Sequence, residues 1–247
     1  MRVTAMSKNQ ITEGVIWKQL LFFFFPILLG TLFQQLYNTA DTVVVGRFVG
    51  TQALAAVGGS TGQIVNLVVN FFVGLASGAT VIIARYYGAR DRIKLNNALH
   101  TAIALSIVGG IVTGIAGILL TPSLLKMMNT PADVIEGSTM YLRIYFAGII
   151  FVFVYNIGSG ILRAVGDSKR PLYFLIVCCF LNIFLDILFV VYLKLGVKGA
   201  AFATVISQAV SALLVILSLT KSVDIYRLLP NKIRFYKSLL IAIITIG

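Results

Sequence analysis

The sequence predicts an all-α integral membrane protein, and three features of its composition point that way. Of the 247 residues, 59% are hydrophobic and only 11% are charged, and the mean hydropathy is +0.97. The apolar residues form long continuous runs and do not alternate with polar ones, which is typical of membrane-spanning helices and not of a transmembrane barrel. Six such runs are long enough to cross a bilayer, so we expect a six-helix transmembrane bundle.

The expected spans follow one another through short connections. They cover residues 17–45, 53–84, 95–120, 140–162, 172–193 and 197–219. A seventh apolar run, 239–247, is too short to cross a bilayer core of about 30 Å. We therefore expect residues 1–220 to form an N-terminal transmembrane lobe. Residues 221–247 would form a cytoplasmic connection and the start of a truncated seventh span, as in an incomplete molecule.

Basic residues predict the orientation of the spans. Fifteen of the 20 lysines and arginines lie in the N-terminal segment or in the second, fourth and sixth connections, and only four lie in the others. The fifteen are Arg2, Lys8, Lys18, Arg85, Arg90, Arg92, Lys94, Arg163, Lys169, Arg170, Lys221, Arg227, Lys232, Arg234 and Lys237. Cytoplasmic loops carry such an excess of positive charge. The sequence therefore predicts a plasma-membrane protein with a cytoplasmic N-terminus.

The first span contains a polar cluster near its centre. On a helix Gln34, Asn38, Asp41 and Thr42 fall at positions i, i+4, i+7 and i+8, which is one face. A carboxylate at bilayer depth costs about 2.5–3.5 kcal/mol on insertion scales. We therefore expect Asp41 to face a protein interior or a water-filled cavity and never lipid.

The same span contains a proline that offers it a place to bend. Pro26 is followed one helical turn later by Gly30. Proline removes a helix hydrogen bond and clashes with the preceding turn, so these two positions are a candidate hinge. The alternative is a proline that the membrane helix tolerates without consequence.

Asp186 is the other acidic residue within an expected span. Asn182 lies one helical turn before it on the same face, and Thr204 begins a polar stripe on the sixth span. Carboxylates from two helices, with amide and hydroxyl oxygens beside them, would form a pocket for a hard cation such as Na⁺. They could equally share one proton. A third interpretation is that Asp41 and Asp186 only tie helices together through hydrogen bonds.

The sequence argues against an enzyme and against a nucleic-acid-binding protein. Its one histidine, His100, lies at a span edge, and no metalloprotease, nucleophile-elbow or P-loop pattern occurs. Cys178 and Cys179 are adjacent in an apolar run, which favours packing over a disulfide or a metal site. The positive charge belongs to the loops and is not interleaved with aromatic residues. We therefore expect no catalysis, no nucleic-acid partner and no cofactor beyond a coupling ion.

Several stretches resemble the multidrug and toxic compound extrusion (MATE) transporters. They are LRAVGDSKRP before the fifth span, FPILLG, QQLYNTAD and VGRFVG in and after the first, and ALAAVG in the second. The resemblance extends in order over residues 10–220. It implies the N-terminal six-helix lobe of a transporter whose two lobes are related by pseudo-two-fold symmetry. A missing C-terminal lobe, or a second copy, would then be needed for full transport.

The resemblance also implies an activity and a site. MATE transporters are secondary active antiporters that export cationic or amphipathic small molecules in exchange for Na⁺ or H⁺. The family's N-lobe cation site matches Asp41, Asn182, Asp186 and Thr204 here, and its bending proline matches Pro26. Ion or proton binding would change the packing and bend of the first helix and thereby weaken substrate binding on the outward-facing side.

The polar residues of the first two long spans are candidates for the substrate cavity. They are Gln34, Tyr37, Asn38, Asn66 and Asn70. Two rival functions remain open at this point. A lipid-linked saccharide flippase of the same superfamily would need a cationic cavity, whereas these spans contain carboxylates and no central lysine or arginine. A channel or a non-transporting membrane subunit would work without a counter-substrate.

Overall fold

The computed structural model describes residues 16–222 and 225–247, and within them the chain forms helices and loops without strands. The helices are α1 (Ile16–Phe48), α2 (Thr51–Gly58), α3 (Ser60–Gly88), α4 (Arg92–Met127), α5 (Ala132–Ala147), α6 (Ile149–Ala164), α7 (Lys169–Asp186), the π-helical η1 (Ile187–Tyr192), α8 (Val197–Thr220), the 3-10 turn η2 (Pro230–Lys232) and α9 (Lys237–Ile246). Arg2 and Lys8, which contribute to the predicted orientation, lie outside the described residues.

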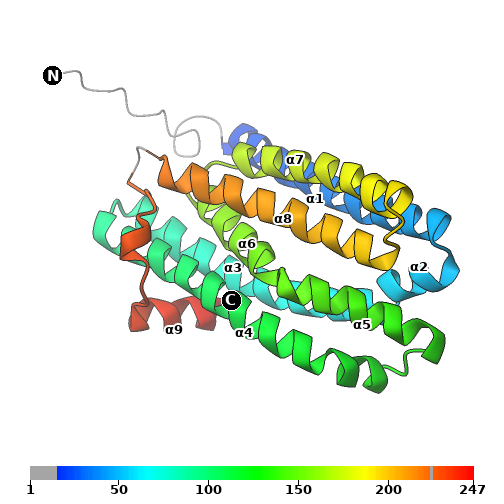
Figure 1. The fold of residues 1–247 in the computed structure, drawn as a ribbon. Helices are drawn as coiled ribbons and strands as arrows, with labels where there is room; N and C mark the ends of the chain where they lie inside the picture. The colour runs from blue at the N-terminus through cyan, green and yellow to red at the C-terminus, as the bar shows by residue number, and fades with distance from the viewer. Residues whose placement is uncertain (1–15, 223–224) are drawn as a thin grey trace.

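The long helices pack side by side into one bundle (Figure 1). Helix α6 packs against α3, α4 and α8, while α7 packs between α1 and α8. Among the described residues five helical stretches are long and apolar enough to cross a membrane, and a sixth is reached if α5 and α6 count as one bent span. The predicted six-helix membrane bundle is therefore confirmed.

The fourth span differs from its predicted limits of 140–162. It begins earlier, with α5, and α5 and α6 meet at an angle of 50°. The first turns of α5 contain Asp133 and Glu136, so a search for apolar runs misses them. The break falls at Gly148, whose backbone lies so close to Val205 of α8 that a Cβ atom would clash there.

The first two spans also show how glycine and proline act here. Helix α1 stays α-helical through Pro26, so the proline does not break it. The second span is divided at Gly59 into α2 and α3, although the two together still form one candidate span, Thr51–Gly88.

Helix α9 lies against α3, where Gly78 allows direct contact with the backbone of Ile243.

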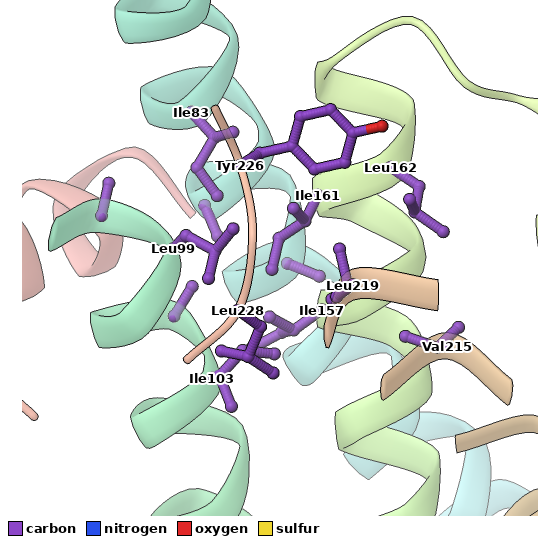
Figure 2. Close-up of a cluster of buried hydrophobic side chains, with 14 of the residues drawn as sticks. Ile83, Leu99, Ile103, Ile157, Ile161, Leu162, Val215, Leu219, Tyr226 and Leu228 are labelled. Atoms are coloured by element: carbon purple, nitrogen blue, oxygen red, sulfur yellow. The ribbon is translucent and has the colours of Figure 1, made fainter. Parts of the chain in front are cut away.

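The segment between α8 and α9 is built into the bundle at the end where the predicted cytoplasmic connections meet. Tyr226 and Leu228 insert among buried residues of α3, α4, α6 and α8 (Figure 2). The labelled residues of this apolar cluster are Ile83, Leu99, Ile103, Ile157, Ile161, Leu162, Val215, Leu219, Tyr226 and Leu228. The Leu228 N–H donates to the Leu219 carbonyl at 3.0 Å, which fixes the start of the segment.

Two side chains of α4 hold the rest of this segment. His100, expected at a membrane interface, is buried and uses both ring nitrogens: Nδ1 lies 2.7 Å from the Asn96 carbonyl, and Nε2 accepts the Leu229 N–H at 3.1 Å. Thr101 donates to the Asn97 carbonyl at 2.8 Å and accepts the Tyr236 N–H at 3.2 Å. Every one of these groups therefore has a partner.

Candidate functional site

Three helices bring together the four residues of the predicted cation site. Asp41 comes from α1, Asn182 and Asp186 from α7, and Thr204 from α8. All four are buried, with exposed fractions of 6%, 0%, 0% and 4%. The prediction that Asp41 and Asp186 face the protein interior and not lipid is thus met within this chain.

The site contains more polar atoms than the protein satisfies. The Thr204 hydroxyl lies 3.4 Å from Asp41 Oδ2 and 3.0 Å from its own helix's Ala200 carbonyl. The Asp41 carboxyl is also within interaction range of the Asp186 and Asn182 side chains. Even so, Asp41 Oδ1, both Asp186 oxygens and both amide atoms of Asn182 have no hydrogen-bond partner. Buried polar atoms in proteins are seldom left in this state.

Local helix geometry explains the position of each carboxylate. Asn182 and Asp186 lie at i and i+4, and α7 ends at Asp186, where the backbone widens into η1. Single π-helical turns are often found at functional sites. On α1, Asp41 shares its buried face with Pro26 and Gly30, and a Cβ on Gly30 would lie 3.2 Å from Leu175 of α7. The candidate hinge therefore lies on the α1–α7 contact that also carries the site.

The predicted polar face of α1 is divided in the structure. Asp41 turns into the bundle, whereas Gln34, Asn38 and Thr42 are exposed. The four residues span about 100° of the helix circumference, and α7 covers only the edge that carries Asp41. The predicted spacing therefore holds on the helix, and within this chain only Asp41 of the four residues is buried.

The candidate cavity residues lie on surfaces that this chain leaves open. Gln34 and Asn38 on α1, and Asn66 and Asn70 on α3, are exposed, and Tyr37 is half-buried. Among the described residues, no other part of the chain covers these five side chains to close a cavity. Their assignment to a substrate cavity stays a prediction.

Two tyrosines near the site were missed by sequence reasoning. Tyr141 and Tyr145 of α5 are both buried, with their rings stacked at a centroid distance of 6.3 Å. Tyr141 lies near Thr204 and the two carboxylates. Their i, i+4 spacing was a usable signal, because it places both rings on one face of a helix.

The chemistry of the donor set can be stated from the residues present. The four side chains offer carboxylate, amide and hydroxyl oxygens, which suit a hard monovalent or divalent cation or a shared proton. Among the described residues no group of three or more histidine, cysteine or acidic side chains could hold a metal ion. Cys178 and Cys179 are buried, as the packing interpretation predicts. These oxygen donors suit a hard cation or a proton better than a soft transition metal.

Fold and site together define a multi-pass helical membrane protein with ionisable residues buried between its spans, the features of the transporter class. Comparison with known proteins makes this specific. The family model MatE matches residues 26–188. The chain belongs to the MATE family.

Known relatives and structures agree with this assignment. The chain is 35% identical over 208 residues to the probable multidrug resistance protein YpnP of Bacillus subtilis (strain 168), covering 84% of this chain and 46% of YpnP. Against a crystal structure of MATE in the straight conformation the TM-score is 0.89, at 30% identity and over 98% of this chain and 54% of that one. Against MATE in the bent conformation it is 0.82, at 31% identity and over 90% and 49%.

The coverage has a direct structural meaning. The chain spans about half the length of the curated relatives and solved structures that it matches. The described bundle therefore corresponds to one MATE lobe.

Proposed function

We propose that this lobe serves a secondary active efflux transporter that exports cationic or amphipathic small molecules in exchange for Na⁺ or H⁺. Asp41, Asn182, Asp186 and Thr204 bind the coupling ion. The observation that carries the proposal is the pair of buried carboxylates with oxygens that no protein donor satisfies. Two adjacent carboxylates away from water are unfavourable unless a cation or proton offsets their charge.

Coupling follows from where the site lies. A cation or proton between Asp41 and Asp186 draws α1 toward α7, and its release lets them separate. Because Pro26 and Gly30 lie on the same helix contact, α1 can respond by bending there. Each elementary charge that crosses the membrane potential supplies about 2.3 kcal/mol per 100 mV. Export results if ion and substrate are bound in alternation.

The open polar surface of α1 and α3 suits a substrate cavity shared with a second lobe. Gln34, Tyr37, Asn38, Asn66 and Asn70 would contribute this lobe's part of its wall. A C-terminal lobe or a second copy would supply the other. We place the protein in the plasma membrane with its N-terminus in the cytoplasm, since the basic connections before α4, before α7 and before α9 all belong to one side of the bundle.

A chimera tests this function. The chain would replace the matching part of YpnP, and the chimera would be reconstituted in vesicles loaded with a cationic dye such as ethidium. We expect dye efflux that is driven by an imposed Na⁺ or H⁺ gradient and lost in Asp41→Asn. Asp91→Asn, a loop carboxylate outside the site, is the matched control and should transport normally.

Efflux that stays coupled in Asp41→Asn would remove the proposed role of the site. The flippase and channel alternatives are not favoured, because the matched relative is described as a multidrug resistance protein. An ion current in planar bilayers without added substrate would reopen the channel alternative.

A further inference from the structure

A second polar cavity lies at the opposite end of α4 from its proline, far along the bundle from the carboxylates. It has a volume of about 570 Å³ and is formed between the first turns of α4 and the segment 231–236 that leads into α9. Its polar lining includes Arg92, Asn96, Lys232 and Arg234. No role in ion coupling involves these residues.

The charge of this cavity is unbalanced. Arg92, Lys232 and Arg234 line it, and no acidic residue does among the part of the chain that the structure describes. The nearest acid in sequence, Asp91, instead accepts the Lys94 N–H and pairs with its ammonium group at 3.6 Å. A cavity with such a lining attracts an anion.

A different cavity, between α7 and α8, provides a comparison within the same molecule. It has a volume of about 560 Å³ and is lined by Arg170 and Lys221. There the Arg170 guanidinium is paired with Asp167 at 3.1 Å and also donates to Ser218 at 3.3 Å. The α4 cavity is therefore the better anion site.

The walls of the α4 cavity are held in place. The His100 ring also lines it and bonds to both Asn96 and Leu229, so it ties α4 to the opposite wall. The Tyr236 N–H is bonded to Thr101, and the Arg234 guanidinium stacks 4.6 Å from the centre of the Tyr236 ring. A binding surface that is ordered in advance loses less entropy when its ligand binds.

The surroundings indicate what kind of anion would bind. The cavity lies where α4 enters its apolar span, and Ile93 and Phe235 beside the cationic residues are 76% and 45% exposed. Exposed apolar side chains next to basic ones, at the end of an apolar span, suit a molecule with a charged head and an apolar body. A free phosphate ion would use only the charges.

We propose that the α4 cavity binds the phosphate group of an acidic phospholipid, with Arg92 and Lys232 as its principal cationic contacts. The bound lipid bridges α4 and the connection to α9, and so fastens the connection against the lobe. This site is independent of the carboxylate site and of the proposed transport.

The test uses the purified 247-residue chain in detergent micelles. Phosphatidylglycerol or phosphatidylcholine is added, and the lipid that stays bound is measured by native mass spectrometry. We expect retention of phosphatidylglycerol over phosphatidylcholine. In the double variant Arg92→Gln, Lys232→Gln we expect phosphatidylglycerol to bind about tenfold more weakly or worse. Each basic residue near a lipid surface adds to the electrostatic attraction for an anionic lipid.

Two further variants make the result specific. Arg85→Gln, Lys169→Gln removes the same charge from exposed positions outside the cavity and should bind like the parent chain. Arg92→Lys, Lys232→Arg keeps the charge and should also bind. Equal loss in the outside variant, or equal retention of both lipids, would overturn the proposal. Displacement of the lipid by inorganic phosphate at the same concentration would overturn the assignment to a lipid.

Discussion

Two parts of this lobe are built on opposite principles. Around Leu228 the apolar cluster is closed, and the side chains of His100 and Thr101 at its edge are hydrogen-bonded. Around Asp41 and Asp186 the burial is as deep, yet carboxylate oxygens and a whole side-chain amide are without partners. The first arrangement stabilises one structure. The second is the arrangement that the proposed ion or proton site would require, because a cation or proton would offset the charge of the carboxylates.

The largest effect is expected in the closed cluster. Ile161→Ala removes a fully buried side chain that touches neighbouring helices, so the free energy of unfolding should fall by about 2 kcal/mol or more. Unfolding in mixed micelles, followed by circular dichroism, measures this. The matched control is Ile111→Ala on the exposed side of α4, which should change the value by less than about 0.5 kcal/mol. Equal losses in both would mean that the cluster is not closely packed.

A smaller effect of opposite sign is expected at the carboxylates. Without Na⁺, the double variant Asp41→Asn, Asp186→Asn should be as stable as the parent chain or more stable by about 1 kcal/mol, because two buried like charges are removed. Added Na⁺, which binds only the folded parent, should then narrow the difference. The same unfolding experiment measures both. A loss of several kcal/mol would show that the carboxylates are structural.

The most local effect is expected at the contact between α4 and the connection to α9. Thr101→Val leaves the Tyr236 N–H without its acceptor and should destabilise this contact by about 1 kcal/mol. Hydrogen exchange of the Tyr236 amide measures the local opening. Thr101→Ser keeps the hydroxyl and should exchange like the parent chain. Unchanged exchange in Thr101→Val would mean that the apolar cluster alone holds the connection.

The sequence predicts the class and the number of spans because apolar length alone determines which segments can cross a bilayer. It predicts less well where tertiary contacts decide. The early start of α5 is hidden by Asp133 and Glu136, and the 50° bend depends on the fit of Gly148 against Val205 of another helix. Neither feature leaves a periodic signal.

In the candidate site, too, the sequence predicts what lies within one helix and not what depends on packing between helices. Helical spacing pairs Asn182 with Asp186 correctly, because both are on one helix. It does not reveal that α7 covers Asp41 while leaving Gln34 and Asn38 exposed, since that depends on the packing of α1. Helical spacing places Tyr141 and Tyr145 on one face of α5, but it does not reveal that Tyr141 lies near Thr204 of α8.

The central claim is that Asp41 and Asp186 together bind one cation or proton, and infrared difference spectroscopy of the purified chain tests it most directly. Spectra are recorded between acidic and alkaline buffer, and with and without Na⁺. The account predicts a carboxyl band that responds to pH or Na⁺, is lost in both Asp41→Asn and Asp186→Asn, and persists in Asp91→Asn. Difference spectra that are identical in all four proteins would contradict it.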